Sequence, residues 1–207
     1  MKNKKLSILT LLLTGTLLFA GCGQSATNSS SNSSTNASSG ESITTEQSSA
    51  TTDANASGDD IFSDMSTTDL DGNEMTSSIF SENKVTLVNV WNVGCTPCVN
   101  EIPELDKLNS EYSGKGAAIY GLYCDFGGGI SDDEMAQIKD IMTNANASYT
   151  QLRMTGTLAA NEKLLNLMAF PTTYVVDSNG TILETIEGSK DYEGWKAVID
   201  RYLADAE

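Results

Sequence analysis

The chain has 207 residues, a formal net charge of −16 at neutral pH and no histidine. A chain this acidic is a poor candidate for binding nucleic acid, because contacts to phosphate require lysine and arginine. A solvated acidic surface that keeps the protein soluble accounts for the charge without any charged partner.

The first 21 residues have the layout of a secretory signal peptide. Lysines near the N-terminus precede an apolar stretch from Leu6 to Ala20, which is short for a membrane-spanning helix. The tetrapeptide Phe19-Ala20-Gly21-Cys22 resembles the cleavage site of bacterial lipoproteins, in which the cysteine receives a lipid and becomes the mature N-terminus. We therefore predict a signal peptide over 1–21 and a lipidated Cys22 that anchors the protein in the lipid bilayer, on the extracytoplasmic side of the cell membrane. An ordinary signal peptide with a chance cysteine is the alternative.

Residues 22–58 are rich in serine, threonine, asparagine, alanine and glycine, and Ile43 is the only large apolar residue among them. Such a composition cannot bury enough apolar surface to offset the entropy of ordering. The sequence therefore predicts a disordered tether over 22–58 and one folded domain over 59–207, which is large enough for a single hydrophobic core.

The first half of this domain reads as a hairpin, a strand and a helix. An Asp71-Gly72 turn between short alternating segments predicts an N-terminal β-hairpin. The apolar, β-branched run over 84–91 predicts a strand buried on both faces. A helical pattern begins at Thr96 and is ended by two glycines, and its apolar stripe consists of Cys98, Ile102, Leu105, Leu108 and Tyr112.

The second half continues the alternation of strands and helices. Its elements are predicted from their turns, caps and periodicity: a strand over 117–124, a helix opened by a Ser131/Glu134 capping box, a short strand within 148–154, a short helix capped by Thr157, a hairpin around Asn179-Gly180 and a last helix from about Asp191. This order indicates an α/β fold with a mixed central sheet and helices on both faces.

Cys95 and Cys98 lie where the first central strand passes into its helix, at the sheet edge where sites gather in α/β proteins. A zinc site needs four ligands, and beyond this pair the domain has only Cys124 and no histidine. A structural disulfide is a second possibility, but a bridge that closes so small a loop constrains the unfolded chain very little. Redox chemistry fits best, because unpaired N–H groups and the helix dipole stabilise a thiolate at a helix N-terminus. We therefore predict a dithiol–disulfide centre, no metal and no further cofactor.

The two cysteines are expected to have different roles. Cys95 is the exposed, attacking sulfur, and Cys98 lies on the same helix face, more buried, where it resolves a mixed disulfide. Pro97 is compatible with the first helical turn, which has no N–H partner to lose. Cys124 is expected to be a small buried hydrophobe, with a third redox thiol as the alternative.

The segments VNVWNVGCTPCVNEIPEL and AFPTTYVVDSNG together are similar to the thioredoxin-like, membrane-tethered thiol–disulfide oxidoreductases of the TlpA/ResA type. The resemblance implies a thioredoxin-like fold with an N-terminal hairpin and an inserted segment, which includes Ser131 to Met154, after the second central strand. Pro171 matches the family's cis-proline and, with its neighbours Phe170 and Thr172, is implied to contact the substrate.

The same resemblance assigns a proton acceptor. Asn89 stands where thioredoxin itself has a buried aspartate, and an amide cannot take up the proton. Glu101, three residues after Cys98, matches an acidic position of the ResA type and is implied to exchange protons with that thiol. An ordinary helix-surface carboxylate is the alternative. The active-site loop is assigned to Gly94, Thr96, Pro97 and Trp91, and Gly94 replaces an aromatic residue that the family commonly has there.

By resemblance, the protein is a disulfide reductase that takes electrons from a membrane thiol donor of the CcdA type and passes them to disulfides of exported client proteins. We expect a monomer. A disulfide-forming oxidase is the first alternative, because direction follows the reduction potential and the supply of partners. A thiol peroxidase is disfavoured by Val88 and Asn92, which occupy the positions of the peroxidatic Pro and Thr, and a copper-handling protein is disfavoured by the absence of histidine.

Overall fold

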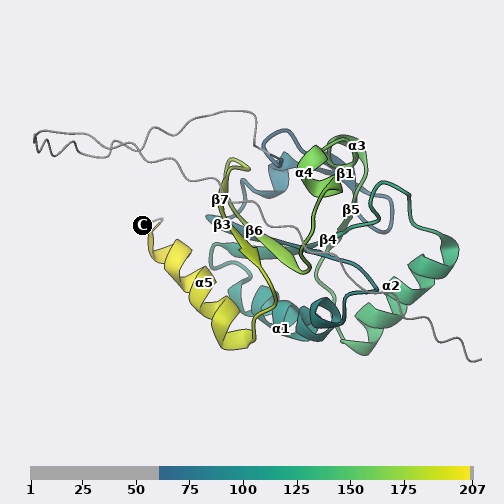
Figure 1. Ribbon diagram of the computed structural model, residues 1–207. Coiled ribbons are helices and arrows are strands. Elements are labelled where there is room, and N and C mark those ends of the chain that lie inside the picture. The colour runs from purple at the N-terminus through teal and green to yellow at the C-terminus, as the bar shows by residue number, and fades with distance from the viewer. Residues whose placement is uncertain (1–60, 206–207) are drawn as a thin grey trace, which may run out of the picture. The chain divides into compact units, whose positions relative to one another are not determined.

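The computed structural model describes residues 61–205 (Figure 1). The predicted signal peptide over 1–21, the lipidated Cys22 and the tether over 22–58 lie outside the described residues. Within the described part, no helix combines the length and the apolar character that crossing a membrane requires.

A five-stranded sheet forms the centre of this region. Its spatial order is β5-β4-β3-β6-β7. β3, β4 and β5 pair in parallel, whereas β6 pairs antiparallel with both β3 and β7, so the sheet is mixed, as predicted. The strands are β3 (Val85–Trp91), β4 (Ala117–Tyr123), β5 (Gln151–Arg153), β6 (Thr172–Asp177) and β7 (Ile182–Glu187).

β3 is buried along its whole length because it is the middle strand and both faces of the sheet are covered. Successive side chains point to opposite faces. Leu87 and Trp91 therefore join the core on one face, and Val88 and Val90 join the core on the other. The continuous apolar run in the sequence reflects this double burial.

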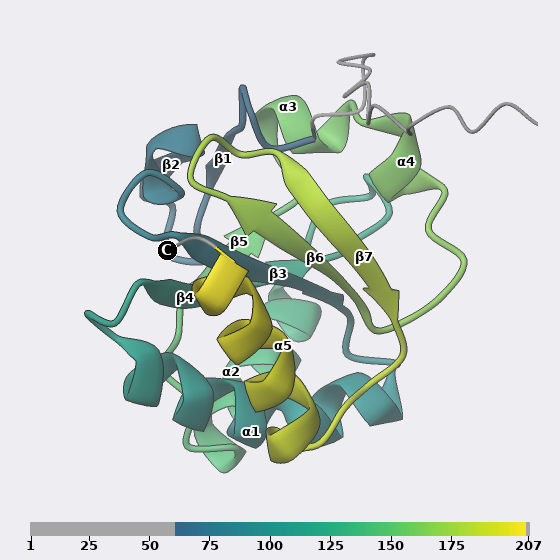
Figure 2. The ribbon, with the colours of Figure 1, turned by 90° about the vertical axis from the view of Figure 1, so that its left-hand side faces the viewer.

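Two layers cover the sheet (Figure 2). One face carries the helices α1 (Thr96–Tyr112), α2 (Asp132–Asn144) and α5 (Tyr192–Asp205). The other face carries the short helices α3 (Gly156–Ala159) and α4 (Glu162–Leu165), the hairpin of β1 (Ser66–Thr68) with β2 (Glu74–Thr76), and the 3₁₀ turn η1 (Ser77–Ile79). Helices on both faces are therefore confirmed.

The segment after β5 differs from the prediction of one helix capped by Thr157. It forms two short helices, and Thr157 lies inside the first, where its hydroxyl accepts a hydrogen bond from the backbone N–H of Ser66 at 3.0 Å. The side chain of Asn161 accepts hydrogen bonds from the N–H groups of Lys163 and Leu164 and so starts a new helix. A strong cap in the middle of the pattern divides the segment.

The predicted capping box of α2 is only half formed. Ser131 caps the helix by accepting a hydrogen bond from the N–H of Glu134 at 3.2 Å. The carboxylate of Glu134, however, does not reach back to Ser131, because it accepts the hydroxyl hydrogen of Tyr123 instead. A tertiary partner has replaced the local one, and it ties α2 to the end of β4.

Candidate active site

The redox centre lies at the C-terminal end of β3, where the chain turns into α1. Cys95 is the N-cap residue of α1, and its Sγ accepts a hydrogen bond from the backbone N–H of Cys98 at 3.2 Å. The two cysteines form a disulfide, with their Cα atoms 5.3 Å apart. Pro97 occupies the first turn of α1, where its missing N–H leaves no helical hydrogen bond unmade.

The two sulfurs differ in accessibility. Cys95 is partly exposed, and its neighbours Gly94, Thr96 and Pro97 are exposed as well. Cys98 is 0% exposed and belongs to the core beneath α1. A partner molecule therefore reaches the sulfur of Cys95 first, whereas Cys98 can act only on the sulfur of Cys95 after that sulfur has bonded to the partner.

Phe170, Pro171 and Thr172 lead into β6 beside this centre. The Phe170–Pro171 peptide bond is cis, as the resemblance implies. Thr172 pairs with Val90, the next-to-last residue of β3, so this segment reaches the same sheet edge as the disulfide. The carbonyl of Pro171 accepts a hydrogen bond from the N–H of Gly188 at 2.8 Å, which holds the segment against the end of β7.

Glu101 lies one turn after Cys98 on the buried side of α1 and is only 3% exposed, so it is not the surface carboxylate of the alternative interpretation. Its Oε1 accepts from Nδ2 of Asn89 at 2.9 Å, and its Oε2 accepts from Nε1 of Trp195 at 3.0 Å and from the backbone N–H of Lys190 at 3.2 Å. Burial raises the pKa of this carboxyl above its ordinary value, and the three hydrogen bonds oppose that rise. A raised carboxyl pKa is suited to proton transfer near neutral pH.

Asn89 presents an amide to the carboxylate. Its Nδ2 donates to Glu101 and also to Oγ1 of Thr173 at 3.0 Å, and its Oδ1 has no partner among residues 61–205. An amide offers a donor at one end and an acceptor at the other. Rotated by half a turn, the amide would accept a hydrogen bond from the protonated carboxyl of Glu101 through Oδ1, so Asn89 suits both protonation states of the acid.

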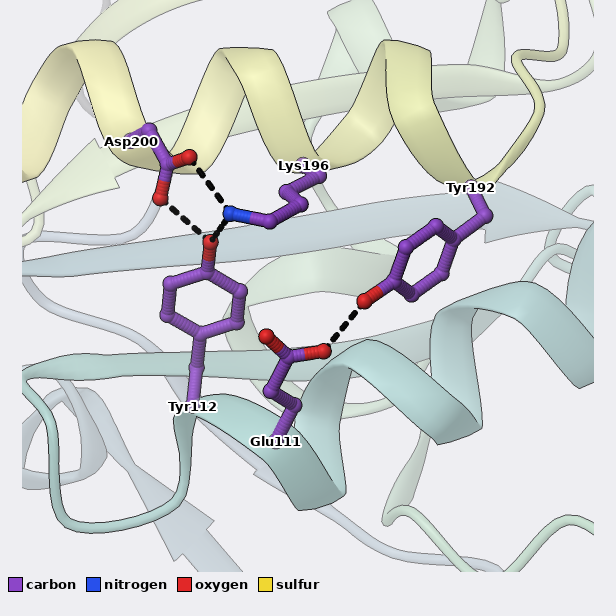
Figure 3. Close-up of polar contacts among 5 residues, drawn as sticks. All are labelled: Glu111, Tyr112, Tyr192, Lys196 and Asp200. Carbon is purple, nitrogen blue, oxygen red and sulfur yellow. Dashed lines mark hydrogen bonds and ion pairs between the residues drawn. The ribbon is translucent and has the colours of Figure 1, made fainter.

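Helix α5, which supplies the indole donor to this carboxylate, is fixed on α1 by side-chain hydrogen bonds (Figure 3). Tyr112 donates to Asp200, and Nζ of Lys196 donates to the hydroxyl of Tyr112 at 2.9 Å and to Asp200 at 2.7 Å. At the N-terminal end of α5, the hydroxyl of Tyr192 donates to the carboxylate of Glu111. These bonds fix the position of α5 along α1 and thereby the position of the Trp195 indole.

Trp91, the last residue of β3, is fully buried in the same core cluster as Cys98. Its ring meets that of Tyr123 edge to face, with ring centroids 5.2 Å apart, and its Nε1 donates to Oε1 of Gln151 at 2.8 Å. The Gln151 amide crosses β4 at Gly121, where a Cβ would come within 1.8 Å of Oε1. Glycine at this position therefore allows the hydrogen bond to the indole.

The sequence did not identify Trp195 or Lys190 as partners of the acid. The two hydrogen bonds to Glu101 span 94 and 89 residues, and they depend on how α5 docks on α1. No local sequence signal reports that docking.

Cys124 is a free thiol, buried in the core on the face of the sheet opposite Cys98. Burial raises the pKa of this thiol, which disfavours the thiolate and agrees with the predicted role of a small buried hydrophobe. Among residues 61–205, no three His, Cys, Asp or Glu side chains form a group that could hold a metal ion.

The chain matches a known protein family. The model of the AhpC/TSA family matches residues 59–185, more than half of the chain, and the chain therefore belongs to that family. The chain is 32% identical over 116 residues to the thiol:disulfide interchange protein DsbE of Pseudomonas aeruginosa, a match that covers 56% of this chain and 57% of that protein. It is 24% identical over 123 residues to the thiol-disulfide oxidoreductase ResA of Bacillus thuringiensis, over 59% of this chain and 63% of that protein.

A solved structure confirms the fold. The thioredoxin-family thiol:disulfide interchange protein from Chlorobium tepidum matches with a TM-score of 0.54 and 19% identity, over 67% of this chain and 92% of that one. The thioredoxin-like fold and the resemblance to the ResA type, both predicted from the sequence, are thus confirmed. The sequence matches span less than two thirds of the length of these curated relatives.

Proposed function

We propose that the protein is a thiol–disulfide oxidoreductase that reduces disulfides of client proteins through Cys95 and Cys98. The observation that carries the proposal is the disulfide at the N-terminus of α1, with one sulfur partly exposed and the other buried one turn from the buried acid Glu101. The names of the DsbE and ResA relatives support the same class of reaction.

The reaction starts from the reduced pair. The helix N-terminus stabilises the thiolate of Cys95, which attacks one sulfur of the client disulfide. A mixed disulfide forms between Cys95 and the client, and the second client sulfur leaves as a thiolate that takes up a proton. Phe170, Pro171 and Thr172, at the same sheet edge, contact the client chain during this step, and Gly94, Thr96 and Pro97 leave the attacked sulfur open to it.

Cys98 completes the transfer. Its thiol gives its proton to the carboxylate of Glu101, and the resulting thiolate attacks the sulfur of Cys95. The client's first sulfur leaves as a thiolate, the client has gained two electrons, and the Cys95–Cys98 disulfide remains. A dithiol donor, for which we propose a membrane protein of the CcdA type, then reduces this disulfide and is itself oxidised.

We further propose that the chain works outside the cytoplasm, anchored by a lipid on Cys22. The apolar leader and the Phe19-Ala20-Gly21-Cys22 box support this placement. Labelling with a radioactive or alkyne fatty acid tests it: the wild-type chain is expected to take up label, and Cys22→Ala to lose it. Label retained by Cys22→Ala would contradict the lipid anchor.

The first test is the reduction potential of the Cys95–Cys98 couple together with turnover of a protein disulfide such as insulin. A potential near or below that of thioredoxin, about −270 mV, supports a reductase, and one near about −120 mV makes the protein an oxidant. Cys95→Ser is expected to abolish turnover, and Cys98→Ser to trap a mixed disulfide. Cys124→Ser, which leaves the pair intact, is the control. Consumption of peroxide at a comparable rate would favour a peroxidase instead.

The role of Glu101 has its own test. Glu101→Gln removes the proton acceptor and is expected to slow the decay of the mixed disulfide by about a hundredfold at neutral pH, while formation of that intermediate changes little. Equal decay rates in the two proteins would show that the proton goes elsewhere.

A further inference from the structure

Large hydrophobic side chains are exposed at three places in residues 61–205: Phe126 is 54% exposed, Met168 94% and Leu183 46%. Leu183 lies on the edge strand β7. Phe126 and Met168 lie instead in two loops, the one between β4 and α2 and the one between α4 and β6.

These two loops lie side by side. The rings of Phe126 and Phe170 meet edge to face, with centroids 5.6 Å apart. At Gly127, a Cβ would stand 3.2 Å from Cδ2 of Leu165. Phe126 and Phe170 therefore form apolar surface on one pair of touching loops, and we refer to these two residues as the Phe126 patch.

The sheet topology puts this patch next to the redox centre. β4 runs parallel to β3, and its last residue, Tyr123, pairs with Trp91 at the end of β3. β6 runs antiparallel to β3, and its first residue, Thr172, pairs with Val90. The end of β4 and the start of β6 thus flank the end of β3, from which the chain leads directly to Cys95.

The backbone at Phe126 is unusual for an aromatic residue. Phe126 has φ +54° and Gly127 has φ +77°, and the N–H of Gly128 donates to the carbonyl of Asp125 at 3.0 Å. Two central residues with positive φ define a turn in which Asn, Asp or Gly is normally found at the first position. Neither the positive φ nor the half-exposed ring of Phe126 is favourable for folding. Strained residues and exposed apolar patches both mark binding sites.

Acidic residues lie on both sides of Phe126 in the sequence, and we refer to Asp125, Asp132 and Asp133 as the acidic border. Asp125 precedes Phe126, and the first turn of α2 holds Asp132, Asp133 and Glu134. Glu134 is engaged with Tyr123, whereas Asp132 and Asp133 are exposed. No lysine or arginine occurs between Asp125 and Ile138. A ligand segment that runs from the patch along the loop toward α2 therefore meets negative charge.

We propose that the Phe126 patch is the docking surface for an extended client segment that carries an apolar side chain close to its cysteine and basic residues beyond it. The apolar side chain covers the rings of Phe126 and Phe170, and the basic residues face Asp132 and Asp133. This inference rests on the proposed reductase function and adds the kind of client sequence that the site selects.

The test compares Phe126→Asn with wild type in the full chain. Asparagine tolerates positive φ, so the variant is expected to unfold at the same or a higher temperature than wild type. The substrates are a disulfide-bonded peptide with leucine beside the cysteine and flanking lysines, and a small disulfide such as hydroxyethyl disulfide, which is too small to reach the patch. The ratio of kcat/KM for the peptide to that for the small disulfide is expected to fall about tenfold in the variant.

Leu183→Asn is the matched control, since it removes an exposed apolar side chain from β7, and its ratio is expected to equal that of wild type. An unchanged ratio in Phe126→Asn, or an equal fall in both variants, would overturn the docking surface. Replacing the peptide's leucine by serine should lower the rate of wild type but not that of Phe126→Asn, and equal sensitivity would overturn the apolar contact. Equal rates with lysine and glutamate flanks would overturn the acidic border. A wild-type chain that reduces neither substrate would refute the proposed function itself.

Discussion

Glu101 combines burial with hydrogen bonds that favour its charged form, and the two effects act against each other. Burial is the stronger, and the pKa of this carboxyl lies above its ordinary value of 4.5. Between the two pKa values, the folded chain holds a proton that the unfolded chain has released, so unfolding releases a proton and is favoured by rising pH. Glu101 therefore costs stability once the pH has risen through its folded pKa.

This sign leads to a stability prediction for Glu101→Gln. The free energy of unfolding of the oxidised variant, relative to oxidised wild type, is expected to increase from about pH 4 to about pH 8, by about 1.4 kcal/mol for each unit by which the pKa is raised. Denaturant titrations of both proteins at the two pH values measure it. Any pH-independent cost of the changed hydrogen bonds cancels when the two pH values are compared. A stability difference between variant and wild type that does not change with pH would contradict the raised pKa.

Trp195 is the indole donor to the same carboxylate, and Trp195→Phe removes that donor. We expect a further rise in the pKa of Glu101, followed by the carboxyl ¹³C resonance, and a loss of about 2 kcal/mol in the free energy of unfolding. Trp91→Phe is the control, because Trp91 is equally buried but donates to Gln151. An equal effect of both substitutions on the Glu101 resonance would mean that the indole acts through packing alone.

Single residues show where sequence reasoning succeeds. The i, i+3 relation between Cys98 and Glu101 was sufficient to place both on the same helix face, because it follows from helix geometry. The cis bond before Pro171 followed from a family resemblance. The partners of Glu101 on α5 could not be predicted, since they depend on the contact between two helices distant in sequence, and neither could the positive φ of Phe126, because the residue type argues against it.

Among the secondary-structure elements, β3, β4 and β5 are joined by more than their backbone hydrogen bonds. The Gln151 side chain of β5 crosses Gly121 of β4 to reach Trp91 of β3. We expect Gly121→Ala to lower the free energy of unfolding by about 1–3 kcal/mol, because the new methyl group displaces the amide and leaves the indole N–H without its acceptor.

A double-mutant cycle isolates this cause. In a Gln151→Ala background, the amide is already absent, and Gly121→Ala is expected to cost less than about 1 kcal/mol. Chemical denaturation of the four proteins gives the coupling. Additive effects would mean that the methyl group clashes with something other than Gln151.

The elements themselves were predicted well where one signal dominated. The continuous apolar run of β3 and the stripe of α1 each had a single interpretation, and both are confirmed. The segment over 155–168 has competing signals, and there the cap at Asn161 prevailed over the periodicity that suggested one helix. In α2, the carboxylate of Glu134 had a distant partner that no local pattern contains.

For the whole molecule, the order of elements was enough to predict an α/β fold with a mixed sheet, because strand–helix alternation leaves few sheet topologies. The thioredoxin-like fold was implied by the family resemblance. The contact between the loop after β4 and the loop before β6 was not predicted. It joins residues that meet only when the sheet has formed, and it is this contact that places Phe126 beside Phe170.

The net charge is −16 for the full chain and −19 without the three lysines of the predicted signal peptide (9 basic and 28 acidic residues), and it yields a last prediction. At about 0.01 M salt the screening length is about 30 Å, so the acidic surface attracts a basic client over a distance comparable to the domain, and at about 0.15 M it shortens to about 8 Å. Between these conditions, kcat/KM for the lysine-flanked peptide is expected to fall about tenfold, that for a glutamate-flanked peptide to rise, and that for a neutral small disulfide to stay within about twofold. Stopped-flow reduction at a series of salt concentrations measures all three. If kcat/KM changes in parallel for all three substrates, salt acts on the redox centre and not on the encounter, because only the encounter depends on the charge of the client.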